Sequence, residues 1–361
     1  MDELIEYKCA KCGGTLVFDS NLQKLRCEFC GSLFTAEELK ALQNELFEKT
    51  PEDYKRTETE NIFWSEQEAQ GIFSYICESC GGEIIGEATT AATSCPFCGN
   101  PVVMKGNLSG ELRPQFVLPF KLDKAAAKKA LKEHFKNKKL LPKVFSSENH
   151  LDEIKGVYVP YWLYDVDSDA SSTFKCTNSS SWISGDYRYT ETKTYNVARA
   201  GNMQFIGIPA DGSKKMDDTL MESIEPYDYS AFEKFNAAYL AGFLADKYDV
   251  PKEDCAERIE SRAKRSAVDA LRRTVSGYAS VTPQDSTVNL KYDEPKYGLL
   301  PVWLLHTSWN GEHYLFAMNG QTGKFVGDLP IDKKRYWMYF VRNLLIVGGI
   351  VAGALSLIMS L

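Results

Sequence analysis

Residues 77–98, CESCGGEIIGEATTAATSCPFC, contain two Cys-x-x-Cys motifs with 14 residues between them. Residues 9–30, CAKCGGTLVFDSNLQKLRCEFC, have the same arrangement, so all four cysteines recur after a shift of 68 residues. A Cys-x-x-Cys turn presents two thiolates to one ion, and two such turns on a hairpin complete a tetrahedral site. The repeat predicts two four-cysteine zinc ribbons, with ligands Cys9, Cys12, Cys27 and Cys30 in the first and Cys77, Cys80, Cys95 and Cys98 in the second.

The ligand type indicates the kind of site. Thiolates select zinc or iron, and Cys95-Pro96-Phe97-Cys98-Gly99 also suits a rubredoxin-like iron site. Disulfides are disfavoured in a reducing cytosol. Because protein sulfur takes all four positions, none is open to water or substrate, so we expect two structural Zn²⁺ ions per chain. Cys176 and Cys255 are interpreted as thiols without a metal role.

The end of the sequence is apolar. Residues 344–361 contain no charged side chain, and 18 helical residues reach about 27 Å, close to the thickness of a hydrocarbon core. Aromatic residues from Tyr336 and the triplet Lys333-Lys334-Arg335 suit an interface and a cytoplasmic flank. The N-terminus has no signal-peptide pattern. We therefore expect a single-pass tail anchor in the cell membrane with the N-terminal bulk in the cytoplasm. The alternative is a buried core helix.

Small residues recur along this apolar segment. They form a stripe in which a GxxxG motif is followed by two serines: Gly349, Gly353, Ser356 and Ser360. Such stripes let helices approach closely in lipid. The stripe predicts homo- or hetero-association through the transmembrane helix.

We expect a multi-domain chain with one larger α+β domain and an antiparallel sheet. The predicted divisions are ribbon 1 at 1–34, a helix and polar linker at 35–70, ribbon 2 at 71–104, the α+β domain at 105–330, and the flank and anchor at 331–361. Within the domain, strands are expected at 116–120, 156–166, 187–197, 203–208, 287–292, 299–308, 313–318 and 324–326, and helices at 123–138, 229–247 and 252–278.

Two local motifs add detail to this division. A capping box, Thr35 with Glu38, opens the helix that follows ribbon 1. A Pro-x-Trp signature occurs in Val159-Pro160-Tyr161-Trp162 and again in Leu300-Pro301-Val302-Trp303. The repeated signature indicates that the α+β domain contains duplicated half-domains.

The net charge and its distribution along the sequence indicate which classes of partner the protein can bind. The net charge of −7 argues against a general nucleic-acid binder, and residues 71–104 carry three glutamates and no lysine or arginine. Residues 121–143 nevertheless hold nine lysines, four of which line one helical face: Lys124, Lys128, Lys132 and Lys136. This face could contact anionic lipid headgroups, an acidic partner or RNA, or be a solvated face.

Catalytic motifs are missing from the sequence. It has four histidines and contains no HExxH pair, GxSxG elbow or phosphate-binding loop. His306 and His313 flank the turn at Trp309-Asn310-Gly311 and are expected to face each other across a hairpin. We therefore expect a protein that is not an enzyme.

The paired ribbons, the Pro-x-Trp strands, the Asn319-Gly320-Gln321-Thr322-Gly323 hairpin and the terminal anchor resemble one bacterial family. These are transcription-factor-IIB-type zinc-ribbon membrane proteins, some encoded beside SPFH-domain and phage-shock-protein-A-like proteins. Members are sometimes labelled primosomal replication-restart helicases, but this sequence lacks a nucleotide-binding loop and a DExH box.

The resemblance implies a non-enzymatic adaptor or scaffold in an envelope-stress or membrane-maintenance complex. It would recruit protein partners, such as SPFH-domain or phage-shock-protein-A-like proteins, at the cytoplasmic face of the membrane. The alternative is a membrane-tethered nucleic-acid-binding protein that uses residues 121–143.

Overall fold

The computed structural model describes most of the chain and divides it into two sheets. The described residues are 9, 16–28, 30–35, 38, 63–64, 69, 72–87, 94–108, 111–147 and 151–359. The smaller sheet is antiparallel and consists of β1 (Leu16–Asp19), β2 (Lys24–Cys27) and β3 (Leu33–Phe34). The remaining described strands form one larger sheet, so most of the molecule is organised around it.

Two strands form the centre of the larger sheet. β8 (Lys155–Ser184) pairs antiparallel with β13 (Lys296–Trp309), and each carries one Pro-x-Trp motif. Both strands are buried on both faces around the motif, which explains why their sequences there are continuously apolar. The sheet is mixed, so the prediction of a purely antiparallel sheet is wrong. β7 (Phe116–Val117) runs parallel to β13, and β11 (Leu244–Asp246) runs parallel to β8.

The two Pro-x-Trp strands have equivalent surroundings. The Trp162 indole N–H donates to the Val250 carbonyl at 2.9 Å, two residues before α5 (Lys252–Arg273). The Trp303 indole N–H donates to the Leu122 carbonyl at 3.1 Å, two residues before α2 (Lys124–Phe135). In each half a short strand precedes the helix and a Pro-x-Trp strand follows it, but in the second half β12 (Ser280–Tyr292) lies between the helix and the Pro-x-Trp strand. The duplication of half-domains stays a prediction.

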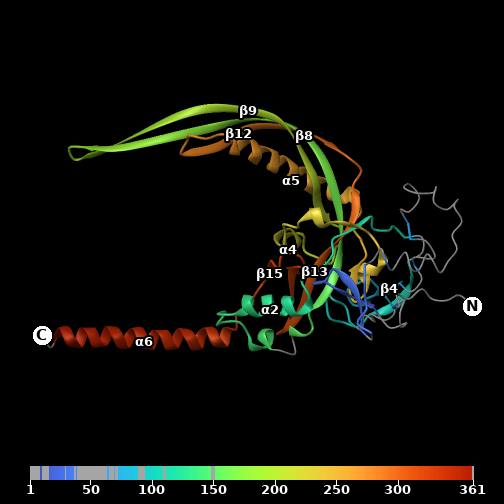
Figure 1. The fold of residues 1–361 in the computed structure, drawn as a ribbon. Helices are drawn as coiled ribbons and strands as arrows, with labels where there is room; N and C mark the ends of the chain where they lie inside the picture. The colour runs from blue at the N-terminus through green and yellow to red at the C-terminus, as the bar shows by residue number, and fades with distance from the viewer. Residues whose placement is uncertain are drawn as a thin grey trace, which may run out of the picture.

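A curved arm projects from the body (Figure 1). It consists of the distal parts of β8 and β9 (Tyr187–Asp211), with β12 (Ser280–Tyr292) paired to the other edge of β8. Helix α5 packs along the arm through residues at four-residue spacing: Ile259, Ala263, Ala267 and Leu271. The arm is longer than the strands predicted at 156–166, 187–197 and 203–208.

The extra length of the arm is rich in serine and threonine, so the sequence shows no apolar alternation there. Cross-strand hydroxyl pairs join its two strands, with Ser179 to Thr192 and Ser181 to Thr190 each at 2.9 Å. At the tip, Trp182 stacks on Tyr189 with ring centroids 5.8 Å apart.

Shorter elements complete the body, and a long helix, α6 (Lys333–Met359), projects from it (Figure 1). The shorter elements are β4 (Ile72–Ile76), β5 (Glu83–Glu87), β6 (Val103–Asn107), η3 (Lys143–Ser146), α4 (Asp218–Ser223), η4 (Tyr229–Ala231), β10 (Glu233–Lys234), η5 (Ala237–Leu240), β14 (Glu312–Asn319) and β15 (Phe325–Gly327). Strands β4–β6, which carry ribbon 2, join the larger sheet where β5 pairs with β11. The domain boundary expected after residue 104 therefore falls inside β6.

Two of the three helices predicted in the larger domain form, and one does not. The helix expected at 123–138 is α2, with Asp123 accepting from the Ala126 amide at 2.7 Å, and the helix expected at 252–278 is α5, which ends at Arg273. The helix predicted at 229–247 is wrong, because that segment forms η4, β10, η5 and β11. The side chains of Asp228 and Asn236 accept hydrogen bonds from backbone amides two residues on, which favours short turns over a continuous helix.

The capping box after ribbon 1 is confirmed. The Thr35 amide donates to Glu38 Oε2 at 2.8 Å, and the Glu38 amide donates to Thr35 Oγ1 at 3.0 Å. Most of residues 36–71, including the predicted linker, lies outside the described residues.

The close packing at the start of β8 can be tested by Gly156→Ala. A Cβ at Gly156 would lie 2.5 Å from Phe243 Cδ1 and 3.3 Å from Phe120 Cζ. We expect a loss of about 1–3 kcal/mol in unfolding free energy, because the overpacked rings must shift. The matched control is Gly106→Ala, whose Cβ would meet nothing within 4 Å. Equal denaturation midpoints for the two variants would contradict the packing.

Candidate metal centres

The four cysteines of ribbon 2 converge on one point. All four Sγ atoms of Cys77, Cys80, Cys95 and Cys98 lie within 4.8 Å of one another. The Cys77–Cys98 separation is 3.5 Å and the Cys80–Cys95 separation is 3.7 Å. A tetrahedral site with metal–sulfur bonds of about 2.3 Å requires sulfurs about 3.8 Å apart. The cluster therefore fits a four-thiolate metal ion, and its separations far exceed the roughly 2.05 Å of a disulfide.

Three cysteines of ribbon 1 form a matching cluster. Cys9, Cys27 and Cys30 lie together, with 3.5 Å between the sulfurs of Cys9 and Cys30. The fourth predicted ligand, Cys12, lies outside the described residues. The described part of ribbon 1 thus supplies three sulfur donors to one point.

A repeated backbone turn positions these sulfurs. The glycine after each of three Cys-x-x-Cys motifs donates to the carbonyl of the motif's first cysteine, at 3.0, 2.7 and 3.0 Å for Gly31, Gly81 and Gly99. All three glycines have positive φ, between 70° and 77°, which other residues rarely adopt. Glycine is therefore required for the backbone to fold beneath the sulfurs.

The thiols of ribbon 2 differ in acidity. Burial opposes ionisation of Cys98, but hydrogen bonds from Asn100 and the neighbouring cysteines lower its pKa to about 7. Burial raises the pKa of Cys80 and Cys95. A metal ion would therefore find one thiol ready to ionise and would displace protons from the others, so its binding would weaken at low pH.

Both ribbons are hydrogen-bonded to the larger domain. In ribbon 2, the Cys80 carbonyl accepts from Lys215 Nζ at 2.6 Å. In ribbon 1, Gln23 Nε2 donates to the Phe120 carbonyl at 2.6 Å, and Asn21 Nδ2 donates to Asp123 Oδ2 at 2.6 Å. The metal clusters are therefore held in place against the body.

The predicted lysine line lies on α2 and is partly neutralised. Lys128 forms an ion pair with Asp152, and Lys136 pairs with Glu133 at 3.3 Å. Lys124 is exposed beside a cavity at the start of the helix, and Lys132 is exposed on the next turns. The four lysines share one side of α2, but two of them already have carboxylate partners.

Helix α6 contains the predicted apolar segment. Lys333–Gly353 is long and apolar enough to cross a membrane, and none of it is buried within the protein, so the alternative of a buried core helix is wrong for this segment. Arg335 donates to the Leu141 carbonyl at 2.7 Å, and the Asp332 amide donates to the Leu140 carbonyl at 2.9 Å, which attaches the helix to the loop after α2.

The small-residue stripe is only partly described. Gly349 and Gly353 are exposed on α6, Ser356 lies in its last turns, and Ser360 falls outside the described residues. Helix association through the stripe stays a prediction.

The histidines meet as expected. His306 Nε2 lies 3.0 Å from His313 Nδ1 across the β13–β14 hairpin. Cys176 and Cys255 are buried and belong to neither of the two cysteine clusters.

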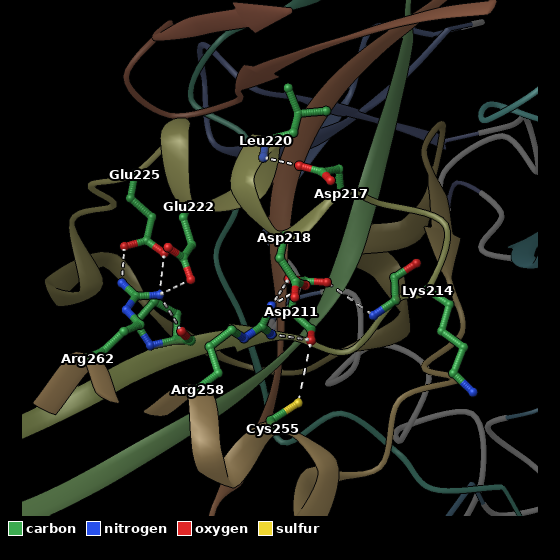
Figure 2. A network of polar contacts seen from close by, with 12 residues as sticks. Asp211, Lys214, Asp217, Asp218, Leu220, Glu222, Glu225, Cys255, Arg258 and Arg262 are labelled. Carbon is green, nitrogen blue, oxygen red and sulfur yellow. Dashed lines mark hydrogen bonds and ion pairs between the residues drawn. The ribbon is translucent and has the colours of Figure 1, made fainter. Parts of the chain in front are cut away.

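The structure also contains a polar network that was not predicted from the sequence (Figure 2). Arg258 donates to Asp211 Oδ2 at 3.1 Å and pairs with Asp218, so it joins the end of β9 to α4. One turn along α5, Arg262 pairs with Glu225 at 2.6 Å. The spacing of the two arginines indicated a shared helix face, but their acidic partners are distant in sequence. The network fixes the base of the arm.

The comparisons with known proteins give one relative. The chain is 35% identical over 339 residues to a Bacillus subtilis (strain 168) protein named "Uncharacterized protein YdjG", and the match covers 93% of each chain. The chain belongs to the YdjG family. No protein-family model matches it, and no solved structure matches it.

The buried carboxyl in this network predicts a pH dependence. Burial and the nearby Asp218 raise the pKa of Asp211 to about 7, although Arg258 opposes the shift. Between pH 4 and pH 7 the folded state holds a proton that the unfolded chain has released, so stability falls as pH rises through this window. We expect the Asp211→Asn variant to lose less stability than the wild type as the pH rises through this window.

The control variant is Asp169→Asn, on the exposed face of the arm, which should keep the wild-type pH profile. The measurement is the denaturation midpoint of the full chain at pH 5 and pH 8. If the midpoints of Asp211→Asn at pH 5 and pH 8 differ by as much as those of the wild type, the pH dependence does not come from Asp211.

Proposed function

We propose that this protein is a membrane-anchored adaptor that recruits protein partners at the cytoplasmic face of the cell membrane and is not an enzyme. The observation that carries the proposal is α6: its apolar segment from Lys333 to Gly353 has no surface buried in the protein. Exposed apolar surface of this size needs lipid or another protein to cover it. Lipid is favoured because α6 carries no charged side chain after Arg342, and its first turn holds the basic residues Lys333, Lys334 and Arg335.

The metal in the ribbons is proposed to be zinc with a structural role. Four sulfur donors with tetrahedral spacing suit zinc, and they leave no open position for a substrate. Cys77, Cys80, Cys95 and Cys98 would hold one ion, and Cys9, Cys12, Cys27 and Cys30 the other. Zinc would stabilise ribbons whose strands have only two to five residues.

We propose that the arm lies in the aqueous phase and not in the membrane. Its tip exposes the apolar and aromatic side chains of Trp182, Ile183, Tyr187 and Tyr189, but four charged side chains lie among and beside them: Asp186, Arg188, Glu191 and Lys193. Charged side chains are costly to place in an acyl core. Because α6 and the arm leave the body on the same side (Figure 1), the membrane-bound form requires α6 to diverge from the arm.

The class of partner rests on the resemblance described above. We propose SPFH-domain or phage-shock-protein-A-like proteins in a membrane-maintenance complex as partners, and association of α6 with a second helix through Gly349 and Gly353. Nucleic-acid binding through residues 121–143 is less favoured, because Lys128 and Lys136 are paired with carboxylates.

Removal of α6 tests the membrane anchor. A chain ending at Asp332 should move from the membrane pellet to the supernatant after high-speed centrifugation of broken cells, because the exposed apolar helix is gone. The control is the full-length chain, which keeps the whole uncharged run of residues 344–361 and should stay in the pellet. Full-length protein in the supernatant, or the Asp332 chain in the pellet, would contradict the anchor.

Substitution of ribbon cysteines tests the metal sites. Purified wild-type protein should contain two zinc ions per chain, and a Cys77→Ser/Cys80→Ser variant should contain one. The matched control, Cys176→Ser, alters a buried cysteine outside both clusters and should keep two. Elemental analysis by mass spectrometry gives the count. Iron in place of zinc would contradict the proposed identity, and loss of both ions in the double variant would contradict independent sites.

A further inference from the structure

A cavity lies where ribbon 1 meets the larger domain. Its volume is about 620 Å³, within the range of about 300–1,000 Å³ that is typical of ligand sites. Its lining comes from β1 and β2 of ribbon 1, the start of α2, the start of β8 and the segment before β11. An occupant would therefore contact the ribbon and the domain together.

The floor of this cavity is apolar and aromatic. Phe243 and Trp303 line it, and their rings belong to a packed cluster in which Phe243 stacks on Phe120 with centroids 4.2 Å apart. Phe18 of ribbon 1 also lines the cavity and lies 6.4 Å from Phe243. A floor of this kind favours an apolar or aromatic side chain, which would add edge or stacking contacts to the rings.

The rim carries basic side chains from three different elements. Arg26 comes from β2, Lys124 from the first turn of α2, and Lys155 from the start of β8. Lys155 Nζ donates to the Ser94 carbonyl at 2.7 Å, and the nearby Glu153 partly balances its charge. Arg26 is more than half exposed and has only a long contact with Asp19, at 3.8 Å.

The two carboxylates of the rim are engaged in local bonds. Asp123 accepts from the Ala126 amide and from Asn21 Nδ2. Asp19 accepts from the amides of Asn21 and Leu22 at 3.1 and 3.2 Å. The carboxylates keep their charge, so the rim carries three cations against two carboxylates, and its exposed cations, Arg26 and Lys124, are the groups with capacity for an incoming anion.

We propose that this cavity binds a segment of a partner protein in which an aromatic side chain is flanked by acidic residues. This inference rests on the adaptor function proposed above and names the chemistry of the partner. The ring would occupy the floor, and the flanking carboxylates would pair with Arg26 and Lys124 at the rim. Because both the ribbon and the domain supply contacts, the bound segment would also strengthen the docking of ribbon 1.

Two other occupants fit less well. A membrane lipid is disfavoured by position, because Lys124 begins α2 whereas α6 is attached beyond its other end, about 18 Å away along a 12-residue helix. A single-stranded nucleic acid requires a basic groove that follows its backbone, whereas this site is one pocket whose rim also carries two carboxylates.

The test is fluorescence anisotropy with a fluorescein-labelled EEFEE peptide and the full-length protein in phosphatidylcholine nanodiscs. We expect saturable binding, about tenfold weaker for EEAEE, which lacks the ring, and about tenfold or more weaker for KKFKK, which reverses the charge. The Arg26→Gln/Lys124→Gln variant should lose about tenfold in affinity for EEFEE. The charge-matched control, Lys129→Gln/Lys175→Gln, lies outside the cavity and should bind like the wild type.

Several results would overturn this inference. They are no binding of EEFEE up to millimolar concentration, equal affinity for EEFEE and KKFKK, equal affinity of the two double variants, or displacement of EEFEE by a thymidine decamer that binds more tightly. Membrane sedimentation and metal content are measured separately on the same protein. A chain that pellets with membranes and carries two metal ions but does not bind EEFEE would refute the cavity and leave the proposed function standing.

Discussion

The antiparallel pairing of β8 with β13 is the interaction on which the other elements depend. Each strand carries a Pro-x-Trp motif, and each tryptophan holds the chain just before a helix: Trp162 binds the Val250 carbonyl before α5, and Trp303 binds the Leu122 carbonyl before α2. The arm is the continuation of β8, and ribbon 2 reaches the same strand through β11 and β5. A change in this pair would therefore move the ribbons, the arm and α2 together.

The two ribbons play different structural parts although their sequences repeat. Ribbon 2 is continuous with the larger sheet, whereas ribbon 1 forms its own sheet and contacts the domain through packing of Phe18 on Tyr239 and Phe243 and through hydrogen bonds from residues such as Gln23 and Asn21. The cavity lies at this contact and not at ribbon 2. Duplication thus gives one ribbon that is part of the framework and one whose position a bound partner could stabilise.

Local sequence predicted the parts of the structure that depend on local chemistry. The spacing of the cysteines and their glycines is sufficient to define the turn at each metal cluster, and Asp123 or the Thr35–Glu38 pair is sufficient to begin a helix. The remainder depends on contacts distant in sequence. The serine- and threonine-rich part of the arm is stabilised only by its partner strand, and residues 229–247 lose their apparent helix to capping turns and to pairing of β11 with β8 and β5. The Asp211–Arg258 contact and the cavity could not be predicted, because their residues meet only in the folded chain.

We propose above all that four cysteine sulfurs enclose each metal ion and so hold the ribbons together. Zinc K-edge X-ray absorption of the purified full-length protein tests this most directly, because the fine structure counts the ligand atoms around the metal. Four sulfur neighbours at about 2.3 Å and no oxygen or nitrogen neighbour are expected. An oxygen or nitrogen atom in the first shell would show that the metal is not enclosed by four sulfurs and would contradict the proposal.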